Sequence, residues 1–291
     1  MYELIRAGGR TYYFQCPAKV GLWKGEGDTV WLIDSGNDKE AGKKIKRVLD
    51  ANGWTLAGIL NTHSHADHTG GNAFLQARTG CAVYAPGAER FFTERPLLEP
   101  AFLYGGFPPG DLRHKFLMAQ PSKALPLTPE VLPEGLEMLP LPGHSWDMTG
   151  FRTADGVVIL ADCLASRETL EKYRLPFLVD VKAYLETLEA VAQMQASLFV
   201  PAHAAPAEEI ATLARLNAEK VYEAAQAICE ICAEPATSET VLQKLFERFG
   251  LTMTFEQHAL VGSTVRSYLA WLQEEGRLQA AVEDNRVVWK A

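Results

Sequence analysis

The most informative stretch of this sequence is Asn61-Thr62-His63-Ser64-His65-Ala66-Asp67-His68-Thr69-Gly70-Gly71. Three of the seven histidines in the chain fall within residues 63–68, and an aspartate lies among them. The apolar run 56–60 before the stretch predicts a buried strand, and the pattern over 73–78 after it predicts a helix. Imidazole and carboxylate groups gathered on a strand-to-helix turn indicate a metal site.

The spacing of these side chains divides them into two pairs. His63 and His65 are two positions apart, so in an extended segment they point to the same side and can bind one ion together. Asp67 and His68 fall where the chain must turn, so they can serve a second ion beside the first. Imidazole suits zinc, iron and similar metals, and a carboxylate adds a harder ligand. The alternative is a polar turn with coincidental histidines, which their concentration in six positions disfavours.

The segment 62–68 resembles the His-x-His-x-Asp-His signature of the metallo-β-lactamase superfamily. The resemblance implies an α/β (α+β) fold, the αββα sandwich, in which two sheets lie between helices and the metal site lies at one sheet edge. It also implies further ligands at later strand ends. Candidates follow in the family's order: Pro142-Gly143-His144, Asp162, and Pro201-Ala202-His203, where alanine replaces the usual glycine.

The resemblance assigns two divalent metal ions, with zinc expected and iron or manganese as alternatives. The seven implied ligands form two groups that share one carboxylate: His63, His65 and His144 for the first ion, Asp67, His68 and His203 for the second, and Asp162 bridging both. Asp67 and Asp162 are then the catalytic carboxylates, which orient a bridging hydroxide.

Composition limits the class of protein. The 291 residues allow one large domain and a smaller one. The formal charge of −8 disfavours a general nucleic-acid binder. The five cysteines lack a disulfide-framework spacing, and neither a signal peptide nor a membrane-spanning apolar run is visible. We therefore expect a cytoplasmic protein without a membrane partner.

The remainder of the first 100 residues fits an α/β order. Residues 4–34 predict antiparallel strands, and strand 30–33 ends in Asp34. Asp34 is either a surface turn residue or, as in the resembled family, a support beneath the metal site. Asn37 is expected to cap a helix over 39–52.

Two segments are candidates for the substrate pocket. Residues 95–129 show no regular periodicity but contain prolines and aromatics, which favours an ordered lid over the metal site, with a dimer contact as the alternative. Within them His114 is expected to be solvated. Residues 167–177 predict a polar loop, in which Tyr173 and Arg174 either face a substrate or lie on the surface.

We expect residues 1–206 to form the catalytic domain and residues 207–291 a helical linker followed by a winged-helix-like domain. A helical pattern runs from 207 to 233, and Cys229 and Cys232 within it are expected to pack in the core. From residue 207 onward there are 8 Lys/Arg and 13 Asp/Glu, a difference of −5. A packing or homodimerisation role is therefore favoured over nucleic-acid binding.

The leading functional hypothesis is a dinuclear hydrolase of a small thioester or other acyl ester, as in relatives of hydroxyacylglutathione hydrolase (glyoxalase II). One alternative is a metal-dependent endoribonuclease or phosphodiesterase of the lactamase-like group that has a C-terminal winged helix. Another is an iron-dependent oxidoreductase on the same fold. After His144 the chain has Ser145-Trp146-Asp147-Met148, where many thioester hydrolases of the superfamily have Thr-Pro-Gly-Ser, so the substrate stays open.

Overall fold

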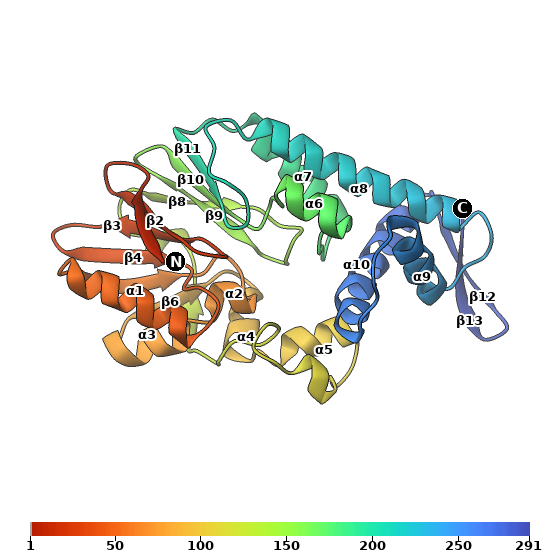
Figure 1. Ribbon diagram of the computed structural model, residues 1–291, viewed down its shortest axis with the longest axis horizontal. Helices are drawn as coiled ribbons and strands as arrows, with labels where there is room; N and C mark the ends of the chain where they lie inside the picture. The colour runs from red at the N-terminus through yellow and green to blue at the C-terminus, as the bar shows by residue number, and fades with distance from the viewer. Residues whose placement is uncertain (1) are drawn as a thin grey trace.

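Two β-sheets form the centre of the molecule in the computed structural model, which describes residues 2–291 (Figure 1). The seven strands of the first sheet are ordered as in the sequence: β1 (Glu3–Arg6), β2 (Thr11–Gln15), β3 (Val20–Lys24), β4 (Thr29–Ile33), β5 (Thr55–Leu60), β6 (Ala82–Ala85) and β7 (Ala124–Pro126). Pairing is antiparallel from β1 to β4 and parallel from β4 to β7. The second sheet has the order β11 (Leu198–Pro201), β10 (Val157–Ala161), β9 (Thr149–Thr153) and β8 (Leu136–Pro140).

Helices cover the outer face of each sheet (Figure 1). The first sheet is covered by α1 (Lys39–Ala51) and α3 (Asn72–Thr79), with the short α2 (Ala66–Thr69) at its edge. The second sheet is covered by α6 (Arg167–Tyr173), α7 (Val181–Gln193) and the start of α8 (Ala211–Ile231).

Alternating side chains on the strands divide the core into layers. On β10, Val157 and Ile159 face the other sheet, whereas Val158 and Leu160 face the helices. On β4, Ile33 lies between the sheets and Leu32 packs against the helix side. Because successive strand residues point to opposite faces, a strand that is apolar at every position must be covered on both sides. The predicted αββα sandwich is confirmed.

The C-terminal part consists of α9 (Ser238–Phe249), α10 (Phe255–Glu274) and a hairpin of β12 (Gln279–Glu283) and β13 (Arg286–Lys290). Most buried apolar side chains of α9 and α10 belong to the same core cluster as those of β10 and α7, and α10 contacts α5 (Leu98–Tyr104), α7, α8 and α9. The domain boundary at residue 206 and the winged-helix assignment stay predictions. None of the helices within residues 2–291 combines the length and apolar composition that a membrane span requires.

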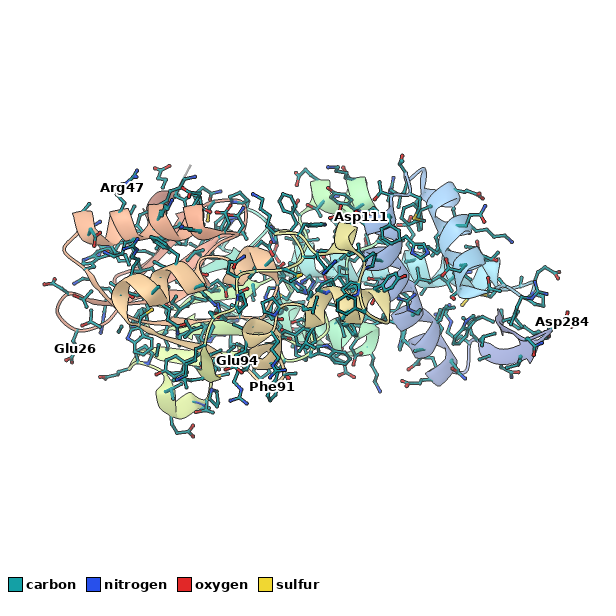
Figure 2. All side chains as sticks on the ribbon, turned by 90° about the horizontal axis from the view of Figure 1, so that it is seen from below. Glu26, Arg47, Phe91, Glu94, Asp111 and Asp284 are labelled. Carbon is teal, nitrogen blue, oxygen red and sulfur yellow. The ribbon has the colours of Figure 1, made fainter. Side chains whose placement is uncertain are left out.

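The segment 95–129 is more regular than its sequence predicts. It follows α4 (Glu89–Glu94) and contains α5 and the 3-10 turn η1 (Gly110–Leu112); a second 3-10 turn, η2 (Pro129–Val131), ends it. The helix α5 tolerates Pro100 because a first-turn residue needs no intrahelical N–H bond, and Gly105 ends it with a φ of 77°. Figure 2, in which Asp111 of η1 is labelled, shows this segment between the sheets and the C-terminal helices.

Three local predictions were wrong. Residues 167–173 form α6 rather than a loop, because Ser166 caps the helix by accepting a hydrogen bond from Thr169 N. The helix α8 begins at Ala211 rather than 207, because Ala207 instead bonds to Phe199 beside the second sheet. The cap of α1 is Asp38 rather than Asn37, since the Asp38 side chain accepts from Ala41 N.

The cap of α1 offers a direct test. Asp38→Ala is expected to lower the free energy of unfolding by about 1 kcal/mol, because it leaves an N-terminal N–H group of the helix without its partner. Asn37→Ala is expected to cost less, because the Asn37 side chain only accepts a hydrogen bond of 3.2 Å from Tyr2 Oη. Denaturant unfolding measures both values, and an equal or larger loss for Asn37→Ala would contradict the assignment.

Candidate metal centre

All seven predicted ligands come together at one edge of the two sheets. The strands β5, β8, β10 and β11 end there, and the turns beyond them carry His63, His144, Asp162 and His203. The remaining three ligands also follow β5: His65 directly precedes α2, and Asp67 and His68 lie on it. The ligating atoms form two groups, each with all atoms within 4.8 Å of one another: His63, His65, His144 and Asp162, and Asp67, His68, Asp162 and His203.

In the first group three imidazole nitrogens point at one another. His65 Nδ1 lies 3.0 Å from His63 Nε2 and 3.0 Å from His144 Nε2. Asp162 Oδ2 completes the group at 3.6 Å from His144 Nε2. Burial lowers the pKa of both His65 and His144 to about 4, so these rings are neutral at pH 7 and have free lone pairs.

The second group is held together by charge. His203 Nε2 lies 3.1 Å from Asp67 Oδ2 and 3.2 Å from Asp162 Oδ2. The Asp162 carboxylate raises the pKa of His203 to about 10. Burial opposes ionisation of Asp67, but His68 and His203 hold its pKa down at about 2. Protonated imidazoles therefore compensate two adjacent carboxylates here, which is the position that a cation would take.

Two buried atoms in the centre have no hydrogen-bond partner among the described residues, and both belong to predicted ligands. They are His68 Nε2 and Asp162 Oδ1, which lie 3.1 Å apart without hydrogen-bond geometry. An unpaired buried nitrogen and oxygen are costly unless something else binds them. The donor set of imidazole and carboxylate groups fits one divalent ion in each group.

Asp34 supports this centre from beneath. Its carboxylate accepts hydrogen bonds from Thr62 N and Thr62 Oγ1, each at 2.8 Å, and lies 2.8 Å from His68 Nδ1. The side chain is buried, and its backbone has a φ of 68°. A carboxylate on the far nitrogen of an imidazole fixes the ring and its tautomer. Asp34 is therefore the support beneath the site rather than a surface turn residue.

Glu89 is a supporting residue that the sequence did not reveal. Its buried carboxylate accepts hydrogen bonds from Ser64 N at 3.0 Å and from Asp147 N at 3.2 Å. Ser64 lies between His63 and His65, and Asp147 follows His144 in the next turn. The Glu89 side chain therefore connects the two turns that carry the histidines of the first ligand group. The segment that departs from the superfamily's common motif is fixed further where Asp147 Oδ2 accepts from Ala88 N at 2.7 Å.

Backbone packing shapes the two later turns. A Cβ atom on Gly143, whose φ is 121°, would lie 2.4 Å from Tyr184 Cα, so only glycine fits before His144. Ala202, in contrast, is not among the described residues with positive φ, so alanine is compatible with this turn. The buried Lys19 ammonium donates to Ala204 O at 2.7 Å and to Ala202 O at 3.3 Å, which holds the turn of His203.

Two of the cavities that reach the centre share His144, Asp162 and Phe177. The first, of about 330 Å³, is called the Tyr173 cavity; its other lining residues are Leu164, Ala165, Thr169, Tyr173, Pro176, Tyr184 and His203. The second, of about 250 Å³, is called the Leu260 cavity; its other lining residues are His65, Ala66, Asp67, Glu99, Phe116, Leu117, Glu256 and Leu260. Of the two predicted substrate residues, Tyr173 therefore borders the centre, whereas Arg174 lines neither cavity.

The segment 95–129 forms one wall of the Leu260 cavity through Glu99, Phe116 and Leu117. Burial raises the pKa of Glu99 to about 8, and its Oε1 lies 3.5 Å from His65 Nε2. His114 was expected to be solvated, but its Nε2 lies 2.9 Å from Glu256 Oε1 of α10 and only part of the side chain is exposed. The predicted lid thus contacts the C-terminal helices beside the centre.

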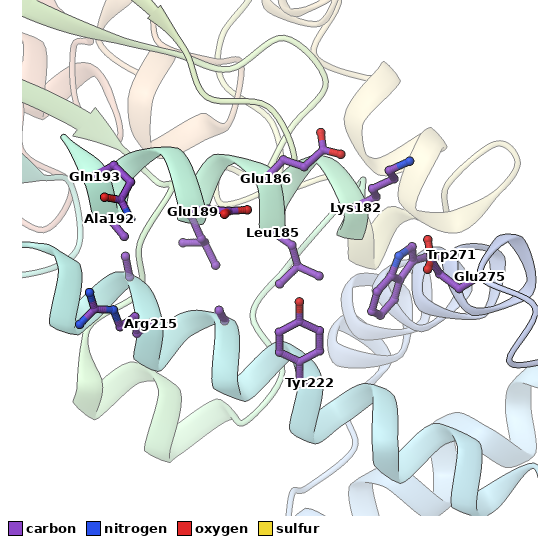
Figure 3. Close-up of a pocket in the computed structure, with 13 residues that line it drawn as sticks. Lys182, Leu185, Glu186, Glu189, Ala192, Gln193, Arg215, Tyr222, Trp271 and Glu275 are labelled. Carbon is purple, nitrogen blue, oxygen red and sulfur yellow. The ribbon is translucent and has the colours of Figure 1, made fainter.

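Another cavity, of about 460 Å³, is lined by residues of α7, α8 and α10, with Leu185, Tyr222 and Trp271 among them (Figure 3). The described residues around it include no histidine and no member of either ligand group. The centre, with its two cavities, is therefore the candidate site for chemistry.

Comparison with known proteins agrees with this geometry. A model of the metallo-beta-lactamase superfamily matches residues 15–203, and the chain belongs to this superfamily. A hydroxyacylglutathione hydrolase of Methylococcus capsulatus is 50% identical over 46 residues, which are 16% of this chain and 18% of that protein. One from Bradyrhizobium sp. (strain ORS 278) is 60% identical over 47 residues, again 16% and 18%. The matched region thus spans less than a fifth of these relatives.

Solved structures resemble the chain over nearly its whole length. A metallo-beta-lactamase family protein from Thermus thermophilus has a TM-score of 0.76 at 20% identity, covering 97% of this chain and 99% of that one. A beta-lactamase domain protein from Burkholderia ambifaria has a TM-score of 0.75 at 18% identity, covering 99% and 93%. At these identities the likeness shows the fold alone, including the C-terminal helices.

The support beneath the centre gives a testable expectation. Asp34→Asn keeps the size of the side chain but removes the charge behind His68, so metal affinity is expected to fall by about 10- to 100-fold. Chelator competition measures the affinity, and circular dichroism checks that the fold is retained. Asp50→Asn is the matched control, because that carboxylate is exposed and bonds only to Lys46 on α1. Unchanged affinity in Asp34→Asn would disprove the supporting role.

Proposed function

We propose that this protein is a dinuclear metal-dependent hydrolase that cleaves a small thioester or other acyl ester. The observation that supports it best is the arrangement of two ligand groups around the shared carboxylate of Asp162. An enzyme with a single ion has no need for the second group, in which His68 and His203 converge on two aspartates. The complete set thus favours a hydrolase over the single-iron oxidoreductase alternative.

The first ion would be held by His63, His65 and His144, the second by Asp67, His68 and His203, and both by Asp162. When bound, two such ions supply Lewis acidity toward the substrate oxygen and lower the pKa of a shared water, so that hydroxide is available near neutral pH. Zinc suits this set of imidazole and carboxylate ligands, and iron and manganese are compatible with it.

The chain itself contributes orientation, proton transfer and exclusion of water. Asp67 has the most exposed carboxylate of the set, with 41% of its side chain accessible against 9% for Asp162. It is therefore placed to accept a proton from the attacking water, while Asp162 stays ionised in the interior. Phe177 borders both cavities and packs edge-on at 5.5 Å from His65, which limits access of bulk water to the centre.

The relatives named hydroxyacylglutathione hydrolase support thioester chemistry, but their short match leaves the rest of the substrate open. A small-molecule substrate, a cytoplasmic location and homodimerisation stay predictions. The endoribonuclease alternative remains the second candidate in the test below, because helices and a terminal hairpin follow the core in this chain.

The proposal is tested by measuring hydrolysis of acyl thioesters with protein of known metal content. Chelation is expected to abolish the rate, and added zinc, iron or manganese is expected to restore it. Asp162→Asn is expected to lose metal and at least about 100-fold in rate together, because it removes the shared charge. The exposed Asp50→Asn again serves as control.

Two outcomes would contradict the proposal. Full turnover and full metal content in Asp162→Asn would show that this carboxylate does not join the two ions. A protein that binds two ions and hydrolyses no thioester or ester would not be an acyl hydrolase, and single-stranded RNA and phosphodiesters would then be assayed.

A further inference from the structure

The two cavities diverge from a common floor. His144 and Asp162 line both of them, and Phe177 borders both, so a substrate whose reacting bond lies at the centre can extend in two directions. An acyl thioester has that shape, with the acyl group on one side of the reacting bond and the thiol part on the other. The side chains of each cavity therefore select one half of the substrate.

The Tyr173 cavity is uncharged beyond the centre. Leu164, Pro176 and Phe177 supply apolar surface, and Thr169 and Tyr173 supply hydroxyl groups. Among the described residues, no lysine, arginine, aspartate or glutamate lines it apart from Asp162. Such a wall accepts an apolar acyl group, and beyond the centre it offers an ionised one hydroxyl groups but no lysine or arginine.

The Leu260 cavity is apolar and acidic. Phe116, Leu117 and Leu260 line it, Glu256 adds a carboxylate, and the described residues around it include neither lysine nor arginine. Glu256 keeps 45% of its side chain accessible, so its carboxylate faces solvent at the cavity mouth. An anionic thiol half that reaches this part of the wall meets the Glu256 carboxylate, and the described lining residues provide no lysine or arginine to offset it.

A further cavity, of about 650 Å³, also borders the centre through His203, and it offers an anionic substrate no free lysine or arginine among the described residues. Glu3 and Glu168 line it, and Lys19 is the one lysine or arginine among the described residues around it. The Lys19 ammonium is already bound to the carbonyl oxygens of Ala202 and Ala204. A substrate carboxylate would therefore have to displace a structural contact in order to bind it.

A glutathione thioester carries two carboxylates and one ammonium group on its thiol half. We propose that the preferred thiol half is instead uncharged or cationic, and that Glu256 on α10 determines this preference. The inference rests on the proposed thioester hydrolysis and narrows its substrate class. It also gives the C-terminal helices a part in the site, since α10 supplies both Glu256 and Leu260.

The test uses three thioesters with the same acetyl group and different thiol halves: S-acetyl-N-acetylcysteamine, which is neutral, acetylthiocholine, which is cationic, and S-acetylglutathione, which is anionic. With the metal-loaded protein, kcat/KM is expected to be at least about tenfold higher for the neutral and cationic compounds than for the glutathione compound. The difference is expected mainly in KM, because the charge lies away from the reacting bond.

Reversing the charge at Glu256 distinguishes a change in substrate selectivity from a general loss of activity. Glu256→Lys is expected to raise kcat/KM for S-acetylglutathione about tenfold relative to acetylthiocholine, and Glu256→Gln is expected to give a smaller change in the same direction. Glu239→Lys is the matched control: Glu239 also pairs with a histidine of α10, His258, at 2.8 Å, but it lines neither cavity of the centre. It is expected to leave the ratio unchanged.

The outcomes distinguish this inference from the proposed function. Hydrolysis with S-acetylglutathione preferred, or with a preference that Glu256→Lys does not shift, would overturn the inference and leave the thioester hydrolase in place. A metal-loaded protein that hydrolyses none of the three compounds would overturn both.

Discussion

Compensation of the buried negative charge of Asp162 is the interaction on which the rest of the centre depends. The carboxylate belongs to both ligand groups, and its oxygens lie 3.1 Å from His68 Nε2 and 3.2 Å from His203 Nε2. Burial of a carboxylate is costly unless positive charge lies next to it. His203 supplies that charge through its raised pKa, and His68 does so because, against the effect of burial, Asp162, Asp67 and Asp34 raise its pKa; a divalent ion bound by the same side chains would also supply it. On the other side of the His68 ring, the Asp34 carboxylate contacts His68 Nδ1 at 2.8 Å.

The layered fold makes this concentration of polar groups possible. Its sheets are covered on both sides by apolar contacts, so the polar side chains gather where strands end and no core packing is lost. Close backbone approaches then fix the turns: Gly143 against Tyr184, and Gly70, where a Cβ atom would lie 2.3 Å from Asn37 C. Such contacts hold the ligand atoms within the small tolerances that metal binding requires.

The C-terminal helices are an integral part of this arrangement. The helix α10 shares a core with α7 and α9 and reaches the segment 95–129, where Arg266 donates to Leu103 O at 3.1 Å and His114 pairs with Glu256. This contact closes one side of the site. It brings Glu256 and Leu260 of α10 into the wall of the Leu260 cavity, far in sequence from the residues that would perform the chemistry.

The sequence by itself determined the layered α/β class, because apolar strands and periodic helices are local signals, and its resemblance to the metallo-β-lactamase signature implied the two groups of candidate ligands. It failed at the cap of α1, because Asn37 and Asp38 are neighbouring polar residues that can both cap a helix. It also failed at residues 167–173, because a helix this short shows little periodicity. Only the tertiary structure determined where Glu89 and Glu256 lie: Glu89 between two ligand-bearing turns, and Glu256 in the wall of the Leu260 cavity. Both are single acidic residues on helices, and what they do depends on which distant turn or cavity the fold brings beside them.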